Sequence, residues 1–499
     1  MSDLPDAWSV AEGDALFHSV RGVTYNKSDA SSVWADGLVP VLRANNIADG
    51  KIRADDLVYV PSSYVSPNQY LRSGDLLIAT SSGSRTVVGK AATASTEHSQ
   101  YAFGAFCTVA RPRVEDLGPW LSLFSRTPAY RNYVERVALG ISINNLRGSD
   151  LKSMPIDVPP LPEQRRIVAK IDSLSGKSRR ARDHLDHIPR LIEKYKQAVL
   201  AAAFRGDLTR EWRMNCDPIS PDDTLTEVAA ARSSLVVAKT RSRFFKDVAA
   251  AGSRVAVDLG SLPSSWAWTT LENITDPTRV IQYGILKPGP HVEDGIPYVK
   301  VMNIRNERIH LSTIRKTSAA IHEQYRRSTI RKGDILLTIR GTVGRIAAVP
   351  PDLDNGNITQ DSVRIAVLPA VNTKYIFWYL LSPFAQAYFL ANQKGVAVRG
   401  INVGDVRPME VPLPSRAEQD ELVRRIEAAF TWIDRLSVDT TRARQLIGHL
   451  DQAVLANAFR GELVPQDPDD EPASVLLQRI KAERAAAPKT KRGRKASVG

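Results

Sequence analysis

The sequence predicts an α+β protein in which two tandem mixed α/β domains are separated by two long helices that form an antiparallel coiled coil. Three observations predict this fold class in the chain of 499 residues. The second half of the sequence restates the first half, each copy contains a long heptad stripe, and shorter β-like runs bounded by glycines precede each stripe. The duplication predicts a pseudo-two-fold internal repeat.

The repeat extends along most of the chain. The segment VPVLRANNIADGKI from Val39 matches IPYVKVMNIRNERI from Ile296, and GDLLIAT from Gly74 matches GDILLTI from Gly333. Farther on, AVLAAAFRGDL in the first half matches AVLANAFRGEL in the second. The helical part is copied more closely than the globular part, which predicts two similar scaffolds that carry different surface residues.

The repeat divides the chain into six predicted segments. They are a first globular domain (1–160), a first long helix (161–206), a connector with a short helix (207–260), a second globular domain (261–415), a second long helix (416–461) and a C-terminal segment whose basic end we expect to be disordered (462–499).

Each long helix has apolar residues at alternating spacings of four and three, which is the heptad pattern of a coiled coil. The alternative is an ordinary amphipathic helix packed on its own domain. The predicted interface residues are Ile167, Ile171, Leu174, Leu185, Ile188 and Ile192 in the first helix and Leu422, Ile426, Ile433, Leu436, Ile447 and Leu450 in the second. Antiparallel pairing is favoured because the connector then enters the second globular domain locally.

Local signals predict where the helices begin, bend and end. Each helix follows a proline-rich stretch, and proline suits a first helical turn. Gly206 and Gly461 are placed to form left-handed C-terminal caps. Pro189 removes a backbone hydrogen bond from the first helix and is expected to kink it.

Composition favours a polyanionic partner and excludes several other classes. The formal net charge is +13, and cations placed on phosphates release counterions. The two cysteines are far apart in the sequence, which argues against a disulfide framework or a zinc site and fits a reducing cytoplasm. No apolar run approaches the length that a membrane span needs, and the common catalytic and metal-binding motifs are not found, so we expect no catalytic residue and no metal site.

Each globular domain offers a glycine-flanked loop after a predicted strand. Glycine allows close backbone approach, and arginine can bind a guanine edge or a phosphate. The alternative is that these loops are hairpin turns with solvated arginines and that Asn46 and Asn303 are structural turn residues. The candidate nucleic-acid-binding residues are Arg43, Asn45, Asn46, Ser81, Ser82, Arg85, Lys90, Lys300, Asn303, Arg305, Arg340, Thr342, Arg345 and Gln360.

Aromatic residues mark the expected cores, because they more often fill a core than form a base-stacking platform. These residues are Trp8, Tyr59, Phe103, Phe106, Trp120 and Phe124 in the first copy and Trp266, Trp268, Phe377, Trp378, Tyr379 and Phe389 in the second.

Two motifs, each present twice, carry a family resemblance. The run MPIDVPPLPEQRRIVAKID from Met154 and the run MEVPLPSRAEQDELVRRIE from Met409 each lead through a heptad helix to Ala-Phe-Arg-Gly. The chain thereby resembles the specificity subunits of Type I restriction-modification systems, from Leu4 to about Arg484. It departs from the pattern at Pro189 and where Ser415 and Arg416 replace the Pro-Leu of the first copy.

The resemblance implies a non-catalytic subunit that binds double-stranded DNA. Its two globular domains would be target-recognition domains, each reading one half of a split target, and its helices would set the gap. Two methyltransferase subunits that bind S-adenosylmethionine, and restriction subunits that use ATP and Mg²⁺, would be its partners, with no cofactor on this chain. It also implies a prokaryotic cytoplasmic location and no membrane partner. The alternatives are a coiled-coil scaffold with protein-binding ends and an enzyme with an unrecognised site.

Overall fold

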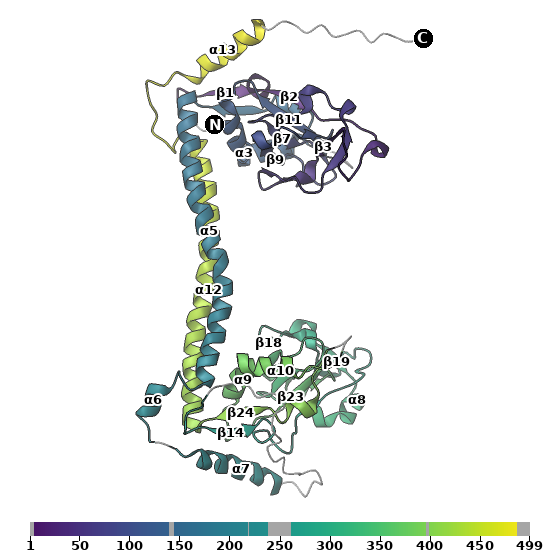
Figure 1. Cartoon of the computed structure of the whole chain (residues 1–499), viewed down its shortest axis with the longest axis vertical. Helices are drawn as coiled ribbons and strands as arrows, with labels where there is room; N and C mark the ends of the chain where they lie inside the picture. Colours follow the sequence, from purple (N-terminus) through teal and green to yellow (C-terminus); the bar gives the residue numbers. More distant parts are fainter. Residues whose placement is uncertain (1–3, 139–143, 218, 238–260, 396–398, 487–499) are drawn as a thin grey trace. The chain divides into compact units, whose positions relative to one another are not determined.

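The computed structural model describes residues 4–138, 144–217, 219–237, 261–395 and 399–486. The chain forms two compact units: unit 1 consists of Met1–His184 with Arg442–Gly499, and unit 2 of Leu185–Thr441. Each unit contains one globular part and part of each long helix (Figure 1). The predicted domain boundaries stay a prediction, since these units cut across both helices.

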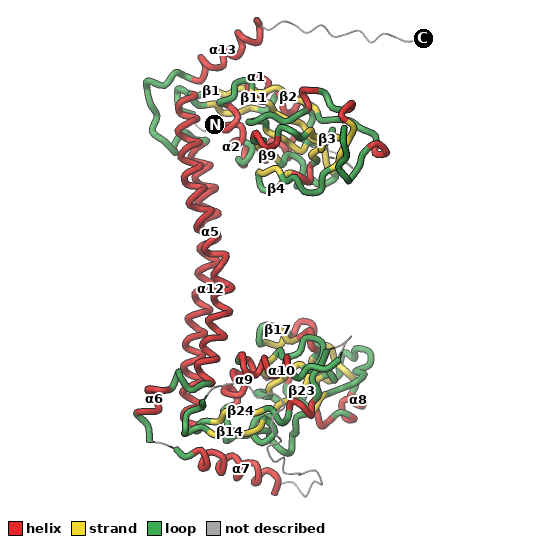
Figure 2. Tube along the Cα trace, viewed as in Figure 1, coloured by secondary structure: helices red, strands yellow, loops and turns green. Residues whose placement is uncertain are grey.

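Unit 1 contains a four-stranded and a three-stranded sheet with short helices around them (Figure 2). The four-stranded sheet has the order β2 (Phe17–Arg21), β11 (Cys107–Pro112), β7 (Leu76–Ala79), β9 (Ala91–Thr93), and the three-stranded sheet has the order β10 (Ala102–Phe103), β3 (Leu38–Leu42), β6 (Val58–Pro61). The remaining strands pair as β1 (Ser9–Glu12) with β13 (Pro155–Val158), β4 (Ile47–Ala48) with β5 (Lys51–Ile52), and β8 (Ser81–Ser82) with β12 (Asn144–Asn145). The helices of this part are α1 (Gly13–Leu16), α2 (Leu117–Phe124), α3 (Pro128–Val137), α4 (Gly148–Lys152) and α13 (Ala473–Ala486).

Unit 2 repeats this topology. Its four-stranded sheet has the order β15 (Gln282–Tyr283), β23 (Ser362–Ile365), β20 (Ile335–Thr338), β21 (Ile346–Ala348), and its three-stranded sheet has the order β19 (Arg315–Thr317), β16 (Ile296–Val299), β22 (Asn357–Ile358). Two pairs complete it: β14 (Ala267–Thr270) with β24 (Glu410–Leu413), and β17 (Ile304–Arg305) with β18 (Arg308–Ile309). Its short helices are α6 (Arg210–Met214), α7 (Pro221–Val237), α8 (Ala319–Gln324), α9 (Thr373–Leu381), α10 (Pro383–Ala391) and α11 (Val403–Val406). The mixed fold class and the internal repeat are confirmed.

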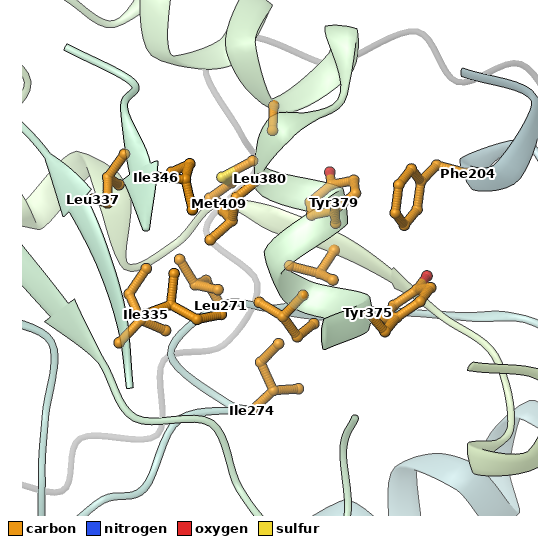
Figure 3. Packing of buried hydrophobic residues seen from close by; sticks show 14 of the residues in the cluster. Phe204, Leu271, Ile274, Ile335, Leu337, Ile346, Tyr375, Tyr379, Leu380 and Met409 are labelled. Atoms are coloured by element: carbon orange, nitrogen blue, oxygen red, sulfur yellow. The ribbon is translucent and has the colours of Figure 1, made fainter. Parts of the chain in front are cut away.

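The hydrophobic cores lie between the sheets and the helices. In unit 2, α9 packs Tyr375, Tyr379 and Leu380 against strand residues such as Leu337 and Ile346, with Phe204 contributed by the first long helix (Figure 3). Burial of such side chains is the main favourable contribution to folding.

Two of the predicted core aromatics are exposed, so those predictions were wrong. Trp268 is 43% exposed because alternate residues of strand β14 point to opposite faces of the sheet. Phe106 is 66% exposed, because it lies in the turn before β11, where its carbonyl accepts backbone hydrogen bonds while its ring stays outside the core. Tyr59, Phe377 and Trp378 are half-buried. The buried members of the predicted set are Trp8, Phe103, Trp120, Phe124, Trp266, Tyr379 and Phe389.

The two long helices are α5 (Leu161–Phe204) and α12 (Arg416–Ala458). In unit 1 the first part of α5 packs on the last part of α12, where Ile167 and Ile171 cluster with Ala458. In unit 2 the last part of α5 packs on the first part of α12, where Phe204 clusters with Leu422. The helices therefore pair antiparallel within each unit, as predicted.

Most predicted interface residues are buried or half-buried, but Leu450 is 55% exposed and its assignment was wrong. A straight helix turns about 20° per heptad relative to a strict seven-residue repeat, so a heptad position can leave the shared face. Helix α5 continues unbroken through Pro189.

The glycine caps are confirmed in both copies. Gly206 and Gly461 have φ of 80° and 72°, in the left-handed region. A Cβ at Gly206 would lie 2.5 Å from the Cγ of Pro263, and a Cβ at Gly461 would lie 2.5 Å from the Cγ of Pro5. The Ala-Phe-Arg-Gly motif therefore fits against the Leu-Pro segment of a globular part in each unit.

The repeated Glu-Gln pair at the start of each helix is also structural. Gln164 donates to the carbonyl of Pro159 at 2.9 Å, and Gln419 donates to the carbonyl of Pro414 at the same distance. The neighbouring carboxylates are buried, and Glu163 accepts from the indole of Trp8 at 3.0 Å. Burial raises the pKa of Glu163. These contacts explain why the helical motifs are copied so closely.

Candidate nucleic-acid interface

In unit 1, several predicted residues gather around one cavity of about 290 Å³, here called the first-repeat pocket. Its lining residues are Arg43, Ala44, Asn45, Ser81, Ser82, Gly83 and Phe106. Strands β3 and β10 run parallel, so the segment after Leu42 and the segment after Phe103 lie at the same end of the pair. Strand β8 supplies the serines.

Asp56 accepts hydrogen bonds from two donors of this pocket, Arg43 and Asn45. Arg43 Nη2 lies 2.8 Å from Asp56 Oδ2, and Asn45 Nδ2 donates to the same oxygen at 2.7 Å. An exposed ion pair of this kind is worth about 0–1 kcal/mol. A DNA base or phosphate can therefore replace Asp56 as the partner of Arg43 at little cost.

Asn46 and Asn303 have structural roles in their turns, as the turn interpretation expects, and their assignment to DNA binding stays a prediction. Both are buried at 1% exposure. Asn46 Oδ1 accepts from the Arg43 amide at 2.8 Å, and Asn303 Oδ1 accepts from the Lys300 amide at the same distance. Each asparagine fixes the turn that carries Arg43 or Lys300 rather than facing a ligand.

The equivalent site of unit 2, here called the second-repeat surface, lies at the ends of the parallel strands β16 and β22. Lys300 follows β16, Gln360 follows β22, and the exposed Arg340 follows β20. Arg340 Nη1 approaches Gln360 Oε1 at 3.5 Å. Met302 is 53% exposed and occupies the sequence position that Asn45 has in the first repeat.

Arg345 and Arg305 line a separate cavity of about 420 Å³. The guanidinium of Arg345 donates to the carbonyl of Ile304 at 3.0 Å, and its amide donates to Thr338 Oγ1 at 2.9 Å. Arg345 therefore connects the glycine loop to the segment that carries Lys300. Arg305 is exposed, with its Nε donating to the Met302 carbonyl.

The remaining candidates lie in the glycine loops. Arg85 and Lys90 are exposed but do not line the first-repeat pocket. Thr342 is exposed, and its carbonyl accepts from Thr338. Sequence reasoning placed Phe106 in a core and made no assignment for Met302. The alignment of the two repeats was the signal that could have found Met302, whereas the equivalence of Phe106 and Asp361 follows only from the strand register.

The described residues contain no group of three or more His, Cys, Asp or Glu side chains placed to hold a metal ion. Burial raises the pKa of the Cys107 thiol to about 12, so this thiol stays protonated at neutral pH. None of the described helices is long and apolar enough to cross a membrane.

Two sites with arginine, lysine and amide donors, on one repeated scaffold but with unlike side chains, are the features expected of a DNA-recognition protein. Comparison with known proteins agrees. The family described as "Type I restriction modification DNA specificity domain" matches residues 5–183 and 290–437. The chain therefore belongs to this family and is a DNA sequence-recognition subunit.

Two curated relatives illustrate the similarity. The chain is 29% identical to the "Type I restriction enzyme EcoKI specificity subunit" of Escherichia coli (strain K12), over 99% of both chains. It is 32% identical to the "Type I restriction enzyme EcoBI specificity subunit" of Escherichia coli, over 74% of this chain and 72% of the relative.

Solved structures show the same fold at low sequence identity. One chain in a solved structure described as "Structural basis underlying complex assembly and conformational transition of the type I R-M system" is 18% identical. Its TM-score is 0.58 over 92% of this chain and 100% of the other. The HsdS subunit from Thermoanaerobacter tengcongensis is 17% identical, with a TM-score of 0.52 over 92% of this chain and 98% of the other.

Proposed function

We propose that each globular part reads one half of a split duplex target and that the paired helices set the unspecified gap between the halves. The observation that carries this proposal is the pair of equivalent sites. Each lies at the end of a parallel strand pair and is built on a buried asparagine, yet Arg43 and Asn45 in one correspond to Lys300 and Met302 in the other. Two domains that read different DNA sequences require this combination of a backbone shared by the two repeats with different side chains.

We further propose that two methyltransferase subunits dock on the paired helices. In unit 2 an apolar groove of about 550 Å³ between α5 and α12 includes the exposed side chains of Leu191, Tyr195 and Trp432. In unit 1, the repeat-equivalent positions of Leu191 and Tyr195 are Leu446 and Leu450, both exposed. Exposed apolar clusters of this kind mark protein interfaces.

The rest of the assembly follows from family membership. Restriction subunits would join the full complex, and S-adenosylmethionine, ATP and Mg²⁺ would bind partner subunits rather than this chain, which would be non-catalytic. A subunit that works on chromosomal DNA would act in the prokaryotic cytoplasm.

Binding measurements on the reconstituted complex test this proposal against a protein-binding scaffold. The complex of the full chain with methyltransferase subunits should bind one split duplex sequence, and its affinity should fall steeply between about 50 and 200 mM salt. Omission of this chain should abolish the sequence preference. Equal binding to all sequences with little salt dependence would support the scaffold instead.

A further inference from the structure

Phe106 presents a large apolar side chain in a polar site. It lines the first-repeat pocket with Arg43, Asn45 and two serines, and 66% of its surface is exposed. The fold uses only its backbone, because its carbonyl accepts from the amides of Thr80 at 2.8 Å and Ser81 at 3.1 Å. The ring is therefore free to contact a ligand.

The second repeat has the same backbone at this point but the opposite side chain. Cys107 pairs with Ala79 and Ser362 pairs with Thr338, so the residues before them, Phe106 and Asp361, are equivalent. The Asp361 carbonyl accepts from the amides of Ile339 at 2.8 Å and Arg340 at 3.2 Å, as the Phe106 carbonyl does in the first repeat. A fixed backbone with an apolar ring in one copy and a carboxylate in the other indicates a position that selects a ligand.

We propose that Phe106 is a specificity-determining residue that contacts the 5-methyl group of one thymine in the half-site read by unit 1. This inference rests on the proposed function. The neighbouring Arg43 and Asn45 supply the donors that pair with purine edges in the major groove. The thymine methyl group is the apolar group that this groove displays, and phenylalanine is one of the side chains that bind it. Asp361 would instead accept a hydrogen bond from a base amine of the other half-site.

Uracil substitution tests the proposed contact with the thymine methyl group at one base at a time. The split target is first mapped from the methylated bases of cells that contain the complex. Duplexes are then made in which one thymine at a time is replaced by uracil, which lacks only the methyl group, and their affinity for the reconstituted complex is measured. The wild type should lose affinity about four-fold at one position of one half-site, the value of one buried methylene-sized group. Phe106→Ala should bind the thymine and uracil duplexes equally, and Phe106→Leu should keep part of the difference.

Trp34→Ala is the matched control, because Trp34 belongs to unit 1, is 60% exposed and does not line the pocket. This variant should keep the wild-type response to uracil. All variants should keep the wild-type thermal unfolding temperature, since neither ring is part of a core.

Several results would overturn the proposal. One is a half-site without an A·T pair, and another is a wild type that is insensitive to uracil at every position. A Phe106→Ala variant that weakens assembly with the methyltransferase but keeps its base preference would make the ring a protein contact. If 2-aminopurine placed in the half-site becomes more fluorescent when the complex binds, and uracil has no effect, the ring would be a wedge between bases. A wild-type complex without any sequence preference would instead refute the proposed function itself.

Discussion

At the scale of single residues, hydrogen bonds within the fold determine which polar side chains remain free to contact DNA. Asn46 and Asn303 are polar, matched in the repeat and adjacent to cations, yet both are buried within their own turns. Arg345 has the residue type of a base reader, but its guanidinium is bonded to a backbone carbonyl. Which donors a fold consumes internally depends on contacts between distant segments, and these are not visible in a local pattern.

The buried asparagines should act on stability rather than on base preference. Asn303→Ala removes the acceptor for the Lys300 amide and the donor that reaches Thr313 Oγ1 at 2.8 Å. We expect a loss of about 1–3 kcal/mol in the free energy of unfolding of unit 2, because buried polar partners are left unpaired. Thermal or urea unfolding measures this loss. A stable variant with a changed target sequence would show that Asn303 reads DNA after all.

Arg340 should act on base preference rather than on stability. Its side chain is exposed, and its contact with Gln360 is long. Arg340→Ala should leave the unfolding temperature unchanged and relax the preference at one position of one half-site, by about 1–3 kcal/mol if the arginine binds a guanine. Selection from a randomised duplex library measures the change. A uniform loss at all sequences would identify Arg340 as a phosphate contact instead.

At the scale of elements, the long helices and their ends are predicted well because heptads, prolines and glycines are local signals. Helix α5 begins at Leu161, the residue next to the proline pair, and both helices are followed by left-handed glycines. The interface was less predictable: Leu450 keeps the heptad spacing but is exposed. Gly461 lies against Pro5, which is far away in the sequence, and Gly206 lies against Pro263, which belongs to a separate motif. No local signal indicates these contacts.

The caps provide a matched pair of substitutions. Gly461→Ala forces alanine into the left-handed region and brings its Cβ against Pro5, so we expect a loss of at least about 1–2 kcal/mol in the free energy of unfolding of unit 1. Gly448→Ala is the control, because Gly448 lies within α12 with nothing within 4 Å of an added Cβ. This control should stabilise the chain by about 0.5–1 kcal/mol. Equal effects of the two substitutions on urea unfolding would contradict the role assigned to the cap.

At the scale of the whole molecule, the duplication was the most informative feature of the sequence. It predicted that both globular parts share one topology, and the strand orders of the two units agree with it. Phe106 is a position whose counterpart the sequence repeat alone did not identify. Its equivalence to Asp361 becomes clear only when the strand register aligns the repeats at a turn where the sequences have diverged.

The helical ruler can be tested by shortening both helices together. Removal of residues 178–184 and 448–454 takes one heptad from each helix around the Arg182–Asp451 ion pair and keeps the heptad phase. At about 1.5 Å per residue the helices lose about 10 Å, or about 3 base pairs of DNA. The recognised gap should shorten by that amount while both half-sites stay the same. An unchanged gap in a folded, active variant would reject the ruler.

We expect this chain alone to determine which split DNA sequence the complex modifies. A genome-wide map of methylated bases in cells that carry the methyltransferase partner, with and without this chain, tests this expectation. One split motif, methylated in both halves, should appear only when the chain is present. Methylation at the same motif in cells without the chain would contradict it.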